Sequence, residues 1–182
     1  MEVEAKIALS SCDELEGIRR RLAELGAVLE EAETERDTYY QHPCRDFAET
    51  DEALRLRRTK SRVEVTYKGP KRIIGGAKER LELTVSVDDG EAADAILRSL
   101  GFKPVLDVVK EREYYRLGDV EVSLDRVEGL GCFVEIEYRG SGSREEAARS
   151  IEEAAAALGL SEKPRIYKSY LELILERRGA AP

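Results

Sequence analysis

Met1-Glu2-Val3-Glu4-Ala5-Lys6 opens the chain and sets the pattern on which the rest of the sequence is built. Read as a β-strand, this stretch puts its charged side chains on one face and its small apolar side chains on the other. A solvated edge strand would explain one such stretch on its own. The alternation returns in four later strands, at Arg55 and Arg57, at Arg80, Glu82 and Thr84, at Lys110 and Arg112, and at Glu135 and Glu137. The sequence therefore predicts strands with one charged and one apolar face.

The composition narrows the class of protein. The 182 residues are enough for one good-sized domain or for two small lobes tightly joined. Charged residues make up 37% of the chain, which has no Asn, no Trp and a single Gln, as is typical of proteins from heat-loving organisms. The net charge of −8 argues against nucleic acid as the main partner. Because no stretch resembles a membrane helix or a signal peptide, we expect a cytoplasmic protein with no membrane partner.

The cysteines and the single histidine limit the chemistry further. Cys12, Cys44 and Cys132 are odd in number and widely spaced, which argues against a disulfide framework, and Cys132 is expected to be a small buried residue. With His42 as the only histidine, multi-histidine metal chemistry is excluded. Any metal ion is therefore expected to be a hard cation held by carboxylates.

The apolar periodicities predict a mixed α+β chain with eight strands and four helices. The strands are expected at residues 1–6, 33–41, 53–58, 63–68, 78–87, 105–116, 119–125 and 132–139. The helices are expected from Ser10 or Ser11 to Gly26, and over residues 91–100, 144–158 and 167–178. Residues 42–51 and 69–76 are expected to form loops, the second because of its Gly and Pro residues.

An internal repeat divides the sequence into halves of about 1–76 and 77–182 within a single domain that spans 1–182. Leu22-Ala-Glu-Leu-Gly26 is followed by Tyr39-Tyr40, and Leu97-Arg-Ser-Leu-Gly101 is followed at the same distance by Tyr114-Tyr115. Two such halves supply eight strands, enough to close an antiparallel barrel and remove its exposed edges. We therefore expect a closed eight-stranded β-barrel with its helices packed outside.

The charged strand faces would then converge inside the barrel. Burying so many ions costs free energy unless the ions pair with one another and with a multiply charged ligand. Arg and Lys suit phosphate oxygens, and clustered Glu and Asp suit Mg²⁺ or Mn²⁺. A triphosphate with a divalent metal ion is the ligand class that matches both sets of charges.

The charged motifs also occur in the order found in a known family. They are Glu2-x-Glu4-x-Lys6, Arg55-x-Arg57, Tyr67-Lys68-Gly69-Pro70, Arg80-x-Glu82, Lys110-x-Arg112, and the run Leu124-Asp125-x-Val127-x-Gly-Leu-Gly-x-Phe133-x-Glu135-x-Glu137. By this set the chain resembles, over nearly its whole length, the CYTH superfamily of triphosphate tunnel metalloenzymes. The Gly-Pro after Lys68 and the turn at 128–131 are most similar to its class IV adenylyl cyclase branch. Thr84 departs from the family, which often has an acid at this position.

The resemblance implies roles for particular residues. The ligands of Mg²⁺ or Mn²⁺ would be Glu2, Glu4, Asp125, Glu135 and Glu137. The triphosphate would be bound by Lys6, Arg55, Arg57, Lys68, Arg80, Glu82, Lys110 and Arg112. Of these residues, the ones expected to take part in catalysis are Lys6, Arg57 and Arg112, together with Asp125.

The resemblance favours one reaction and leaves others open. The first expectation is an adenylyl cyclase that converts ATP into 3′,5′-cyclic AMP and pyrophosphate. The alternative is a triphosphatase that hydrolyses inorganic tripolyphosphate, thiamine triphosphate or a nucleoside triphosphate. A non-catalytic nucleotide- or polyphosphate-binding module and a structural dimerisation module are the further alternatives, and the sequence does not decide whether the chain forms a homodimer.

Overall fold

The computed structural model describes residues 2–74 and 77–179, apart from the side chains of Glu2, Ile74 and Ala77. The chain is mixed α+β, and it divides into two compact units. The first unit comprises Met1–Ala32, Arg72–Glu79 and Glu111–Tyr167, and the second comprises Glu33–Lys71, Arg80–Lys110 and Lys168–Pro182. These units and the two repeat halves are different divisions of the chain, and a single domain over 1–182 stays a prediction.

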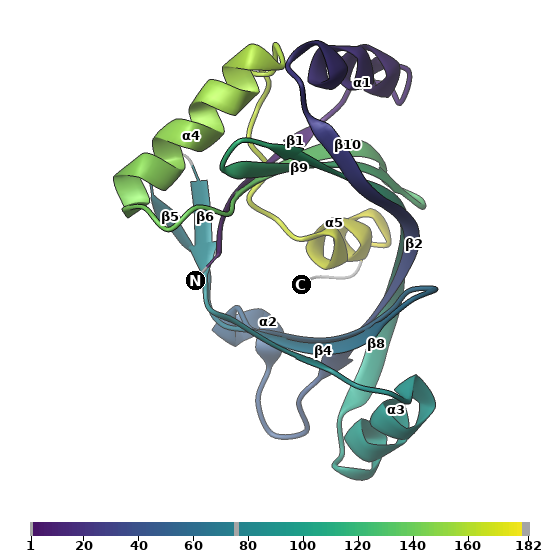
Figure 1. Cartoon of the computed structure of the whole chain (residues 1–182). Helices are drawn as coiled ribbons and strands as arrows, with labels where there is room; N and C mark the ends of the chain where they lie inside the picture. The colour runs from purple at the N-terminus through teal and green to yellow at the C-terminus, as the bar shows by residue number, and fades with distance from the viewer. Residues whose placement is uncertain (1, 75–76, 180–182) are drawn as a thin grey trace. The chain divides into compact units, whose positions relative to one another are not determined.

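Ten strands lie in one sheet within the described residues (Figure 1). They are β1 (Glu2–Ala8), β2 (Val28–Gln41), β3 (Ala53–Arg58), β4 (Val63–Lys68), β5 (Arg72–Ile74), β6 (Ala77–Arg80), β7 (Glu82–Ser86), β8 (Lys103–Leu117), β9 (Val120–Val127) and β10 (Gly131–Tyr138). Their hydrogen-bonded order is β5-β6-β1-β10-β9-β8-β2-β3-β4-β7. This order has two ends, so the prediction of a closed barrel of eight strands is wrong in both closure and strand number, whereas the prediction of a large antiparallel sheet is confirmed.

Pro70 explains much of the difference in strand number. The β4–β7 ladder ends at Lys68 opposite Glu82, and the β5–β6 ladder begins at Arg72 opposite Glu79, so the register shifts by one residue between them. Proline has no backbone N–H to donate to a ladder, and one extra residue produces a bulge. The predicted strand 78–87 is therefore divided into β6 and β7 at Leu81, and the predicted loop contains β5.

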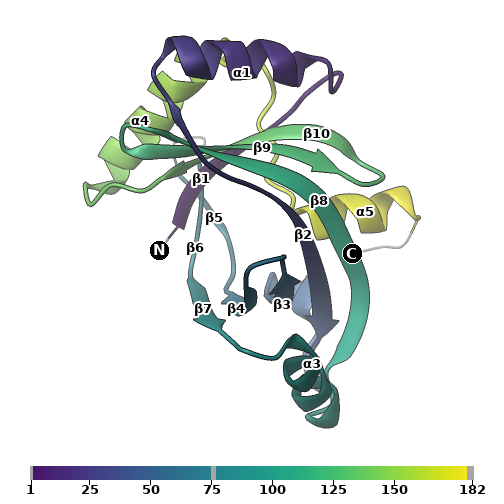
Figure 2. The ribbon, with the colours of Figure 1, turned by 45° about the vertical axis from the view of Figure 1, so that its right-hand side comes forward.

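Two helices cover the apolar face of the sheet in the first unit. They are α1 (Glu14–Glu24) and α4 (Arg144–Ala157), which lie on the same side of β1, β9 and β10 in Figures 1 and 2. Ile7, Val122, Val134 and Ile136 are fully buried beneath them. Because strand side chains alternate between faces, the charged residues of β1 and β10 lie on the opposite face of this sheet.

The second unit has a smaller core. Its helix α3 (Gly90–Ser99) packs on β3 and β4 through Ala93 and Leu97, over the buried Leu54 and Leu56. Asp89 caps this helix by accepting hydrogen bonds from the N–H groups of Glu91 and Ala92. The segment predicted as a polar loop contains a short helix, α2 (Phe47–Thr50), whose Phe47 joins the same core.

The last helix, α5 (Tyr170–Arg177), is an exception to the prediction that helices pack on the apolar strand faces. The ring centre of Tyr170 lies 6.0 Å from Nζ of Lys110, and Lys110 is one of the alternating charged residues of β8. This contact brings α5 to the charged face of the second unit. The sequence did not indicate it, because the apolar stripe of a helix does not show which partner it buries against.

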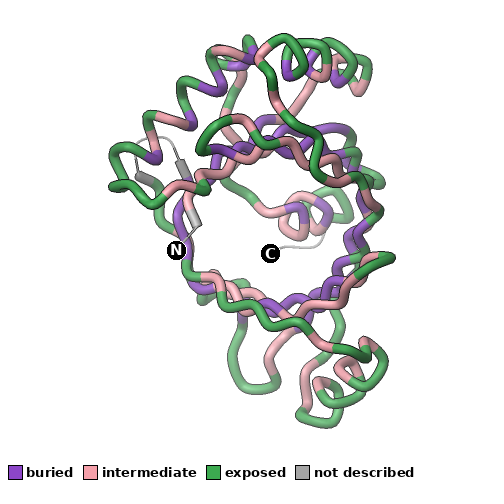
Figure 3. Tube along the Cα trace, in the orientation of Figure 1, coloured by how far each residue is buried: buried purple, intermediate pink, exposed green. Residues whose placement is uncertain are grey.

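Charged side chains are buried in both units, as the sequence predicted. Figure 3 shows buried segments along most of the strands, and the buried residues include Glu4, Lys6, Arg55, Arg57 and Arg80 in addition to Lys110 and Asp125. Arg55, Arg57, Arg80 and Lys110 all belong to the second unit and none of them is scattered over its surface.

The structure contains one disulfide that the sequence analysis argued against. Cys12 and Cys132 are joined across 120 residues, with their Cα atoms 5.2 Å apart, within the first unit. Spacing in sequence cannot reveal this pair, because Leu9 and Cys132 are brought together by the β1–β10 ladder (N···O 2.9 Å) and Cys12 lies just beyond it. Cys44 is exposed and unpaired among the described cysteines.

No helix in the described residues is both long enough and apolar enough to cross a membrane.

Candidate functional site

The first unit holds a cluster of charges on β1, β6, β8, β9 and β10 and on the residue that follows β10, which we call the acidic cluster. Its members are Glu4, Lys6, Lys78, Arg112, Glu121, Asp125, Glu135, Glu137 and Arg139. The strand register creates it: Glu4 lies opposite Glu137, which lies opposite Glu121, and Lys6 lies opposite Glu135. Residues two positions apart on these strands share a face, so the predicted carboxylates are brought together by the ladder itself.

Each described carboxylate of this cluster has a basic partner. Nζ of Lys6 lies 3.1 Å from Glu135, and the guanidinium of Arg112 binds Asp125 (Nε···Oδ1 2.5 Å) and Glu135. Lys78 forms an ion pair with Glu4. Arg139 bridges two neighbouring strands, at 2.8 Å from Glu137 and 2.9 Å from Glu121. The structure therefore brings together Glu4, Lys6, Arg112, Asp125, Glu135 and Glu137 in one unit, as the sequence predicted.

Glu2 is the predicted metal ligand that cannot be placed. Its backbone begins β1, but its side chain lies outside the described residues. Glu2 and Glu4 are two positions apart in the same strand, so the expectation that they share a face follows from strand geometry alone.

The acidic cluster fits a divalent metal ion by donor type. Five carboxylates against four basic side chains give it a net charge of −1, and carboxylate oxygens are the ligands that Mg²⁺ and Mn²⁺ prefer. Within the described residues, no three His, Cys, Asp or Glu side chains are gathered closely enough to hold a metal ion by themselves. A bound metal ion would therefore take over carboxylate oxygens that Lys78, Lys6 and Arg112 now neutralise.

The second unit holds a cluster of opposite sign, which we call the basic cluster. Its members are Glu35, Asp37, Arg55, Arg57, Lys68, Arg80, Glu82 and Lys110. Asp37 lies at its centre, directly opposite Arg57 in the β2–β3 ladder. The Arg57 guanidinium donates two hydrogen bonds of 2.7 Å to the Asp37 carboxylate. Lys110 donates a 3.1 Å hydrogen bond to the same carboxylate, and Arg55 lies 3.8 Å from it.

Glu35 adds a second buried carboxylate to the basic cluster. It lies 2.8 Å from the guanidinium of Arg57 and forms an ion pair with Lys110. Arg55 donates a 3.1 Å hydrogen bond to the hydroxyl of Thr66, which is within 3.0 Å of the hydroxyl of Thr84. Thr84 therefore takes part in the hydrogen-bond chain of the charged face.

The charges around Asp37 control its protonation. Burial by itself would raise the pKa of Asp37, but the positive charges of Lys110, Arg57 and Arg55 outweigh it and hold the pKa well below its usual range. Tyr39, two positions along the same strand, is buried, and its burial raises the pKa of its hydroxyl to about 12. At neutral pH Asp37 is thus ionised and Tyr39 is neutral.

The remaining predicted phosphate ligands lie in the same unit but make separate contacts. Lys68 forms an ion pair with Glu82, its direct neighbour across the β4–β7 ladder. Arg80 is bound by backbone carbonyls, at 2.7 Å from Gly69 and 3.1 Å from Asp51. Arg80 therefore also holds the bulge that follows β4, a structural role that its alternating position in the sequence did not indicate.

Glu35 and Asp37 were not predicted as site residues, although their basic partners were. The signal was present, because Glu31, Glu33, Glu35 and Asp37 alternate along β2 just as the residues of the other charged strands do. The acidic cluster has comparable omissions in Lys78, Glu121 and Arg139. All three continue the alternation of a predicted charged strand, because Lys78 lies two residues before Arg80, Glu121 four before Asp125 and Arg139 two after Glu137. Their partners follow only from which strands become neighbours.

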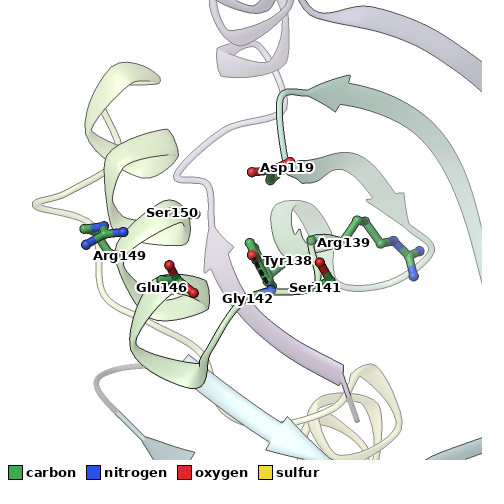
Figure 4. A pocket seen from close by; sticks show the side chains of 9 residues that line it. Asp119, Tyr138, Arg139, Ser141, Gly142, Glu146, Arg149 and Ser150 are labelled. Carbon is green, nitrogen blue, oxygen red and sulfur yellow. Dashed lines mark hydrogen bonds between the residues drawn. The ribbon is translucent and has the colours of Figure 1, made fainter.

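A hollow of about 420 Å³ lies in the first unit where β10 leads into α4, and Arg139 of the acidic cluster is among the residues that line it (Figure 4). Tyr138 and Glu146 line it, and the Tyr138 hydroxyl accepts a 3.0 Å hydrogen bond from the N–H of Gly142. Glu146 accepts a hydrogen bond from the N–H of Ser143 (2.6 Å), whose hydroxyl caps the helix. These side chains hold the turn together, and the predicted site residues are not among those that line the hollow.

Comparison with known proteins gives one family and two curated relatives. The CYTH domain matches residues 1–170. A Methanocaldococcus jannaschii protein, MJ0240, which is provisionally named an adenylate cyclase, is 39% identical over 175 residues that cover 95% of this chain and 98% of that protein. Adenylate cyclase CyaB of Aeromonas hydrophila is 30% identical over 177 residues that cover 94% of this chain and 87% of that protein.

Two solved structures have a similar fold. The PH1819 protein of Pyrococcus horikoshii OT3 is 40% identical, has a TM-score of 0.82, and is matched over 98% of this chain and all of that one. HpAC1 of Hippeastrum is 17% identical with a TM-score of 0.71, over 100% of this chain and 98% of that one. HpAC1 is described as having a dominant triphosphatase activity, and at this identity the likeness is one of fold alone.

Proposed function

Because this chain belongs to the CYTH family, we propose that it is a divalent-metal-dependent enzyme that acts on a triphosphate, and that its reaction is the conversion of ATP into 3′,5′-cyclic AMP and pyrophosphate. The names of the M. jannaschii and A. hydrophila relatives support the choice of adenylyl cyclase. CYTH proteins generally depend on a divalent metal ion, and the choice between Mg²⁺ and Mn²⁺ is part of the proposal.

The separation of charge between the two clusters is the observation that carries the proposal. Five basic against three acidic side chains give the basic cluster a net charge of +2, whereas the acidic cluster carries −1. Three buried cations, Arg55, Arg57 and Lys110, surround the carboxylate of Asp37. A phosphate group presents the same acceptor chemistry as a carboxylate with more charge, so these donors suit it well.

In the proposed site the basic side chains hold the triphosphate. Arg57 supplies a planar fork of donors for two phosphate oxygens, and Lys110 and Lys68 supply point charges. Arg55 and Arg80 complete the set, with Glu82 keeping the Lys68 ammonium in place. These contacts stabilise the negative charge that gathers on the departing pyrophosphate, which lowers the barrier of the reaction.

The acidic side chains are proposed to hold the metal ion. Glu4, Asp125, Glu135 and Glu137, together with Glu2, are the ligands that this proposal assigns. When bound, the metal ion supplies Lewis-acid polarisation of phosphate oxygens and lowers the pKa of an attacking hydroxyl. The proposal also assigns Lys6 and Arg112 to the triphosphate as cations; in the structure Lys6 pairs with Glu135, and Arg112 pairs with Asp125 and Glu135.

The proposed chemical step forms one bond and breaks one. The 3′-hydroxyl oxygen of ATP bonds to the α-phosphorus, and the bond from this phosphorus to the oxygen that bridges to the β-phosphate breaks. The hydroxyl proton passes to solvent and pyrophosphate leaves. Cyclisation demands that the 3′-oxygen be held in line with the breaking bond, whereas hydrolysis needs only a water molecule beside a well-held phosphate.

Triphosphate hydrolysis is the second candidate. The fold likeness to HpAC1, which is described as having a dominant triphosphatase activity, favours it, and so does its less demanding geometry. A fold can support more than one reaction, so the residues that hold the phosphates do not by themselves decide between water and ribose as the attacking group.

Separation of the reaction products tests the proposal. We expect ATP with Mg²⁺ or Mn²⁺ to yield cyclic AMP and pyrophosphate with little ADP, and we expect 3′-deoxy-ATP to bind without reacting. Orthophosphate released from tripolyphosphate far faster than cyclic AMP is formed would replace the cyclase by a triphosphatase. If these compounds bind tightly and none of them is converted to product, the protein is a non-catalytic binding module.

A further inference from the structure

A row of three polar side chains crosses the charged face of the second unit. Arg55 of β3 lies opposite Thr66 of β4, and Thr66 lies opposite Thr84 of β7. Arg55 donates a 3.1 Å hydrogen bond to the Thr66 hydroxyl, and the hydroxyl oxygens of Thr66 and Thr84 are 3.0 Å apart. The three side chains therefore form one continuous hydrogen-bonded chain across three strands.

The direction of this chain follows from the donors and acceptors that it contains. A guanidinium can only donate, so the Thr66 oxygen accepts from Arg55. Thr66 is fully buried, which keeps water away from its hydroxyl proton. The Thr84 oxygen is the one acceptor that the described residues bring within hydrogen-bonding distance of this proton. Because a buried hydroxyl proton without an acceptor is strongly unfavourable, Thr66 donates to Thr84.

Thr84 is therefore the outer end of the chain. Its oxygen accepts from Thr66, and its own proton has no acceptor in the described part of the protein. Unlike Thr66, Thr84 is exposed, so this proton is available to a bound ligand. Each hydroxyl is polarised by the donor behind it, beginning with the positive charge of Arg55. A chain ordered in this way is best completed by an anionic acceptor.

The cations beside Thr84 indicate which anion this acceptor belongs to. Lys68 lies two positions beyond Thr66 on β4, opposite Glu82, which lies two positions before Thr84 on β7. Nε of Arg55 is buried, and the described residues provide no hydrogen-bond partner for it. Thr84 thus shares one strand face with two of the cations that we assign to the phosphates, and one of these cations is not saturated by the protein itself.

We propose that Thr84 is a further substrate-binding residue, and that its hydroxyl donates a hydrogen bond to a phosphate oxygen of the triphosphate that Arg55 and Lys68 also bind. This inference rests on the function proposed above, because it takes a triphosphate as the ligand. Thr66 is then a positioning residue. It connects Arg55 to Thr84 and sets the direction in which the Thr84 hydroxyl donates.

Calorimetric titration of the full chain with inorganic tripolyphosphate in the presence of Mg²⁺ tests this inference. Thr84→Val removes the hydroxyl and keeps the shape of the side chain. We expect it to raise the dissociation constant at least about tenfold, because the lost donor served a charged acceptor. Thr84→Ser keeps the hydroxyl and is the matched control, which should stay within a factor of about three of the wild type.

A double-mutant cycle separates direct contact from an effect that passes through Arg55. Thr66→Val breaks the chain behind Thr84 and leaves the Thr84 hydroxyl in place. If Thr84 contacts the phosphate, Thr84→Val should weaken binding at least about fivefold in the Thr66→Val background as well. If Thr84 only orients Thr66 and Arg55, the second substitution should add nothing. Circular dichroism checks that each variant is folded, and Thr66→Ala replaces Thr66→Val should that variant not fold.

The wild-type titration distinguishes a failure of this inference from a failure of the proposed function. A wild-type chain that does not bind tripolyphosphate overturns both. Saturable wild-type binding that Thr84→Val leaves within a factor of about three overturns the role of Thr84 alone. The same conclusion follows if Thr84→Ser loses as much affinity as Thr84→Val, or if Thr84→Val adds no loss to Thr66→Val.

Discussion

Asp37 is the residue that compensates buried positive charge at the centre of the basic cluster. Its carboxylate is almost fully buried and is surrounded by Arg57, Lys110 and Arg55. Asp37→Asn would leave three buried cations with Glu35 as their remaining buried carboxylate, and we expect it to lower the free energy of unfolding by about 3 kcal/mol. Urea denaturation at pH 7 measures this loss.

Asp107→Asn is the matched control for this substitution. Asp107 belongs to the same unit and pairs with Arg36 at 2.8 Å, but both side chains are substantially exposed. An exposed pair contributes at most about 1 kcal/mol, so the control should lose far less. Equal losses in the two variants would show that Asp37 has no special role among the buried charges.

The depressed pKa of Asp37 also predicts how stability depends on pH. A carboxyl whose pKa is lowered in the folded state contributes stability above its unfolded pKa of about 3.9, and loses that contribution as the pH falls toward the folded value. The difference in unfolding free energy between the wild type and Asp37→Asn should therefore be constant above about pH 5 and should shrink below about pH 4. A gap that widens on acidification would contradict the assignment.

Glu4 and Glu135 are the residues whose loss most directly tests the proposed metal ligands. Glu4→Gln and Glu135→Gln should each lower kcat at least about a hundredfold, because either change removes a charged oxygen ligand. Both variants should remain folded by circular dichroism. Glu153→Gln, at an exposed position of α4, is the control and should keep full activity. Full turnover by both site variants at low Mg²⁺ would remove the acidic cluster from the mechanism.

At the scale of elements, the Cys12–Cys132 disulfide joins β10 to the segment that precedes α1. A disulfide that closes a loop of 120 residues is expected to stabilise the fold by about 4–5 kcal/mol through the entropy of the unfolded chain. Cys12→Ser, or full reduction, should lower the free energy of unfolding by about this amount, whereas Cys44→Ser should not change it.

A thiol count on the unfolded, unreduced protein checks the pairing independently. The structure predicts one reactive thiol, from Cys44, and reduction should raise the count to three. Three reactive thiols without reductant would mean that Cys12 and Cys132 are not joined. The expectation that the chain has no disulfide would then be correct.

The alternation of Arg55 with Arg57 and of Glu135 with Glu137 correctly predicted charged strand faces, because period-two patterns follow directly from strand geometry. The helix that ends before Gly101 was predicted for an equally local reason: that glycine has φ +94°, which side chains other than glycine rarely adopt. Local signals of this kind are present in a single sequence.

Features that depend on register or on distant contacts were missed. The shift of one residue at Pro70, the pairing of Cys12 with Cys132 and the approach of Tyr170 to Lys110 each depend on which strands become neighbours. Asp37 is an intermediate case. Its alternating position was visible in the sequence, but its place among three cations depends on β3 and β8 being the two neighbours of β2 in the sheet. The sequence therefore predicted which strands carry charged faces, whereas the ion-pair partners follow from which strands pair in the sheet.

At the scale of the whole molecule, the two compact units hold charge clusters of opposite sign. The first unit carries carboxylates suited to a metal ion, and the second carries buried cations suited to phosphates. Both clusters should be required for turnover under this account. The reaction that follows binding depends on the attacking group, which the charges alone do not select.

Calorimetric titration with inorganic tripolyphosphate tests this central claim most directly, because the ligand has no base or ribose and reports on phosphate recognition alone. Titrations with and without Mg²⁺ separate phosphate binding from the contribution of the metal ion. We expect saturable binding at one site per chain, which becomes at least about tenfold tighter when Mg²⁺ is present. The absence of binding under both conditions would contradict it.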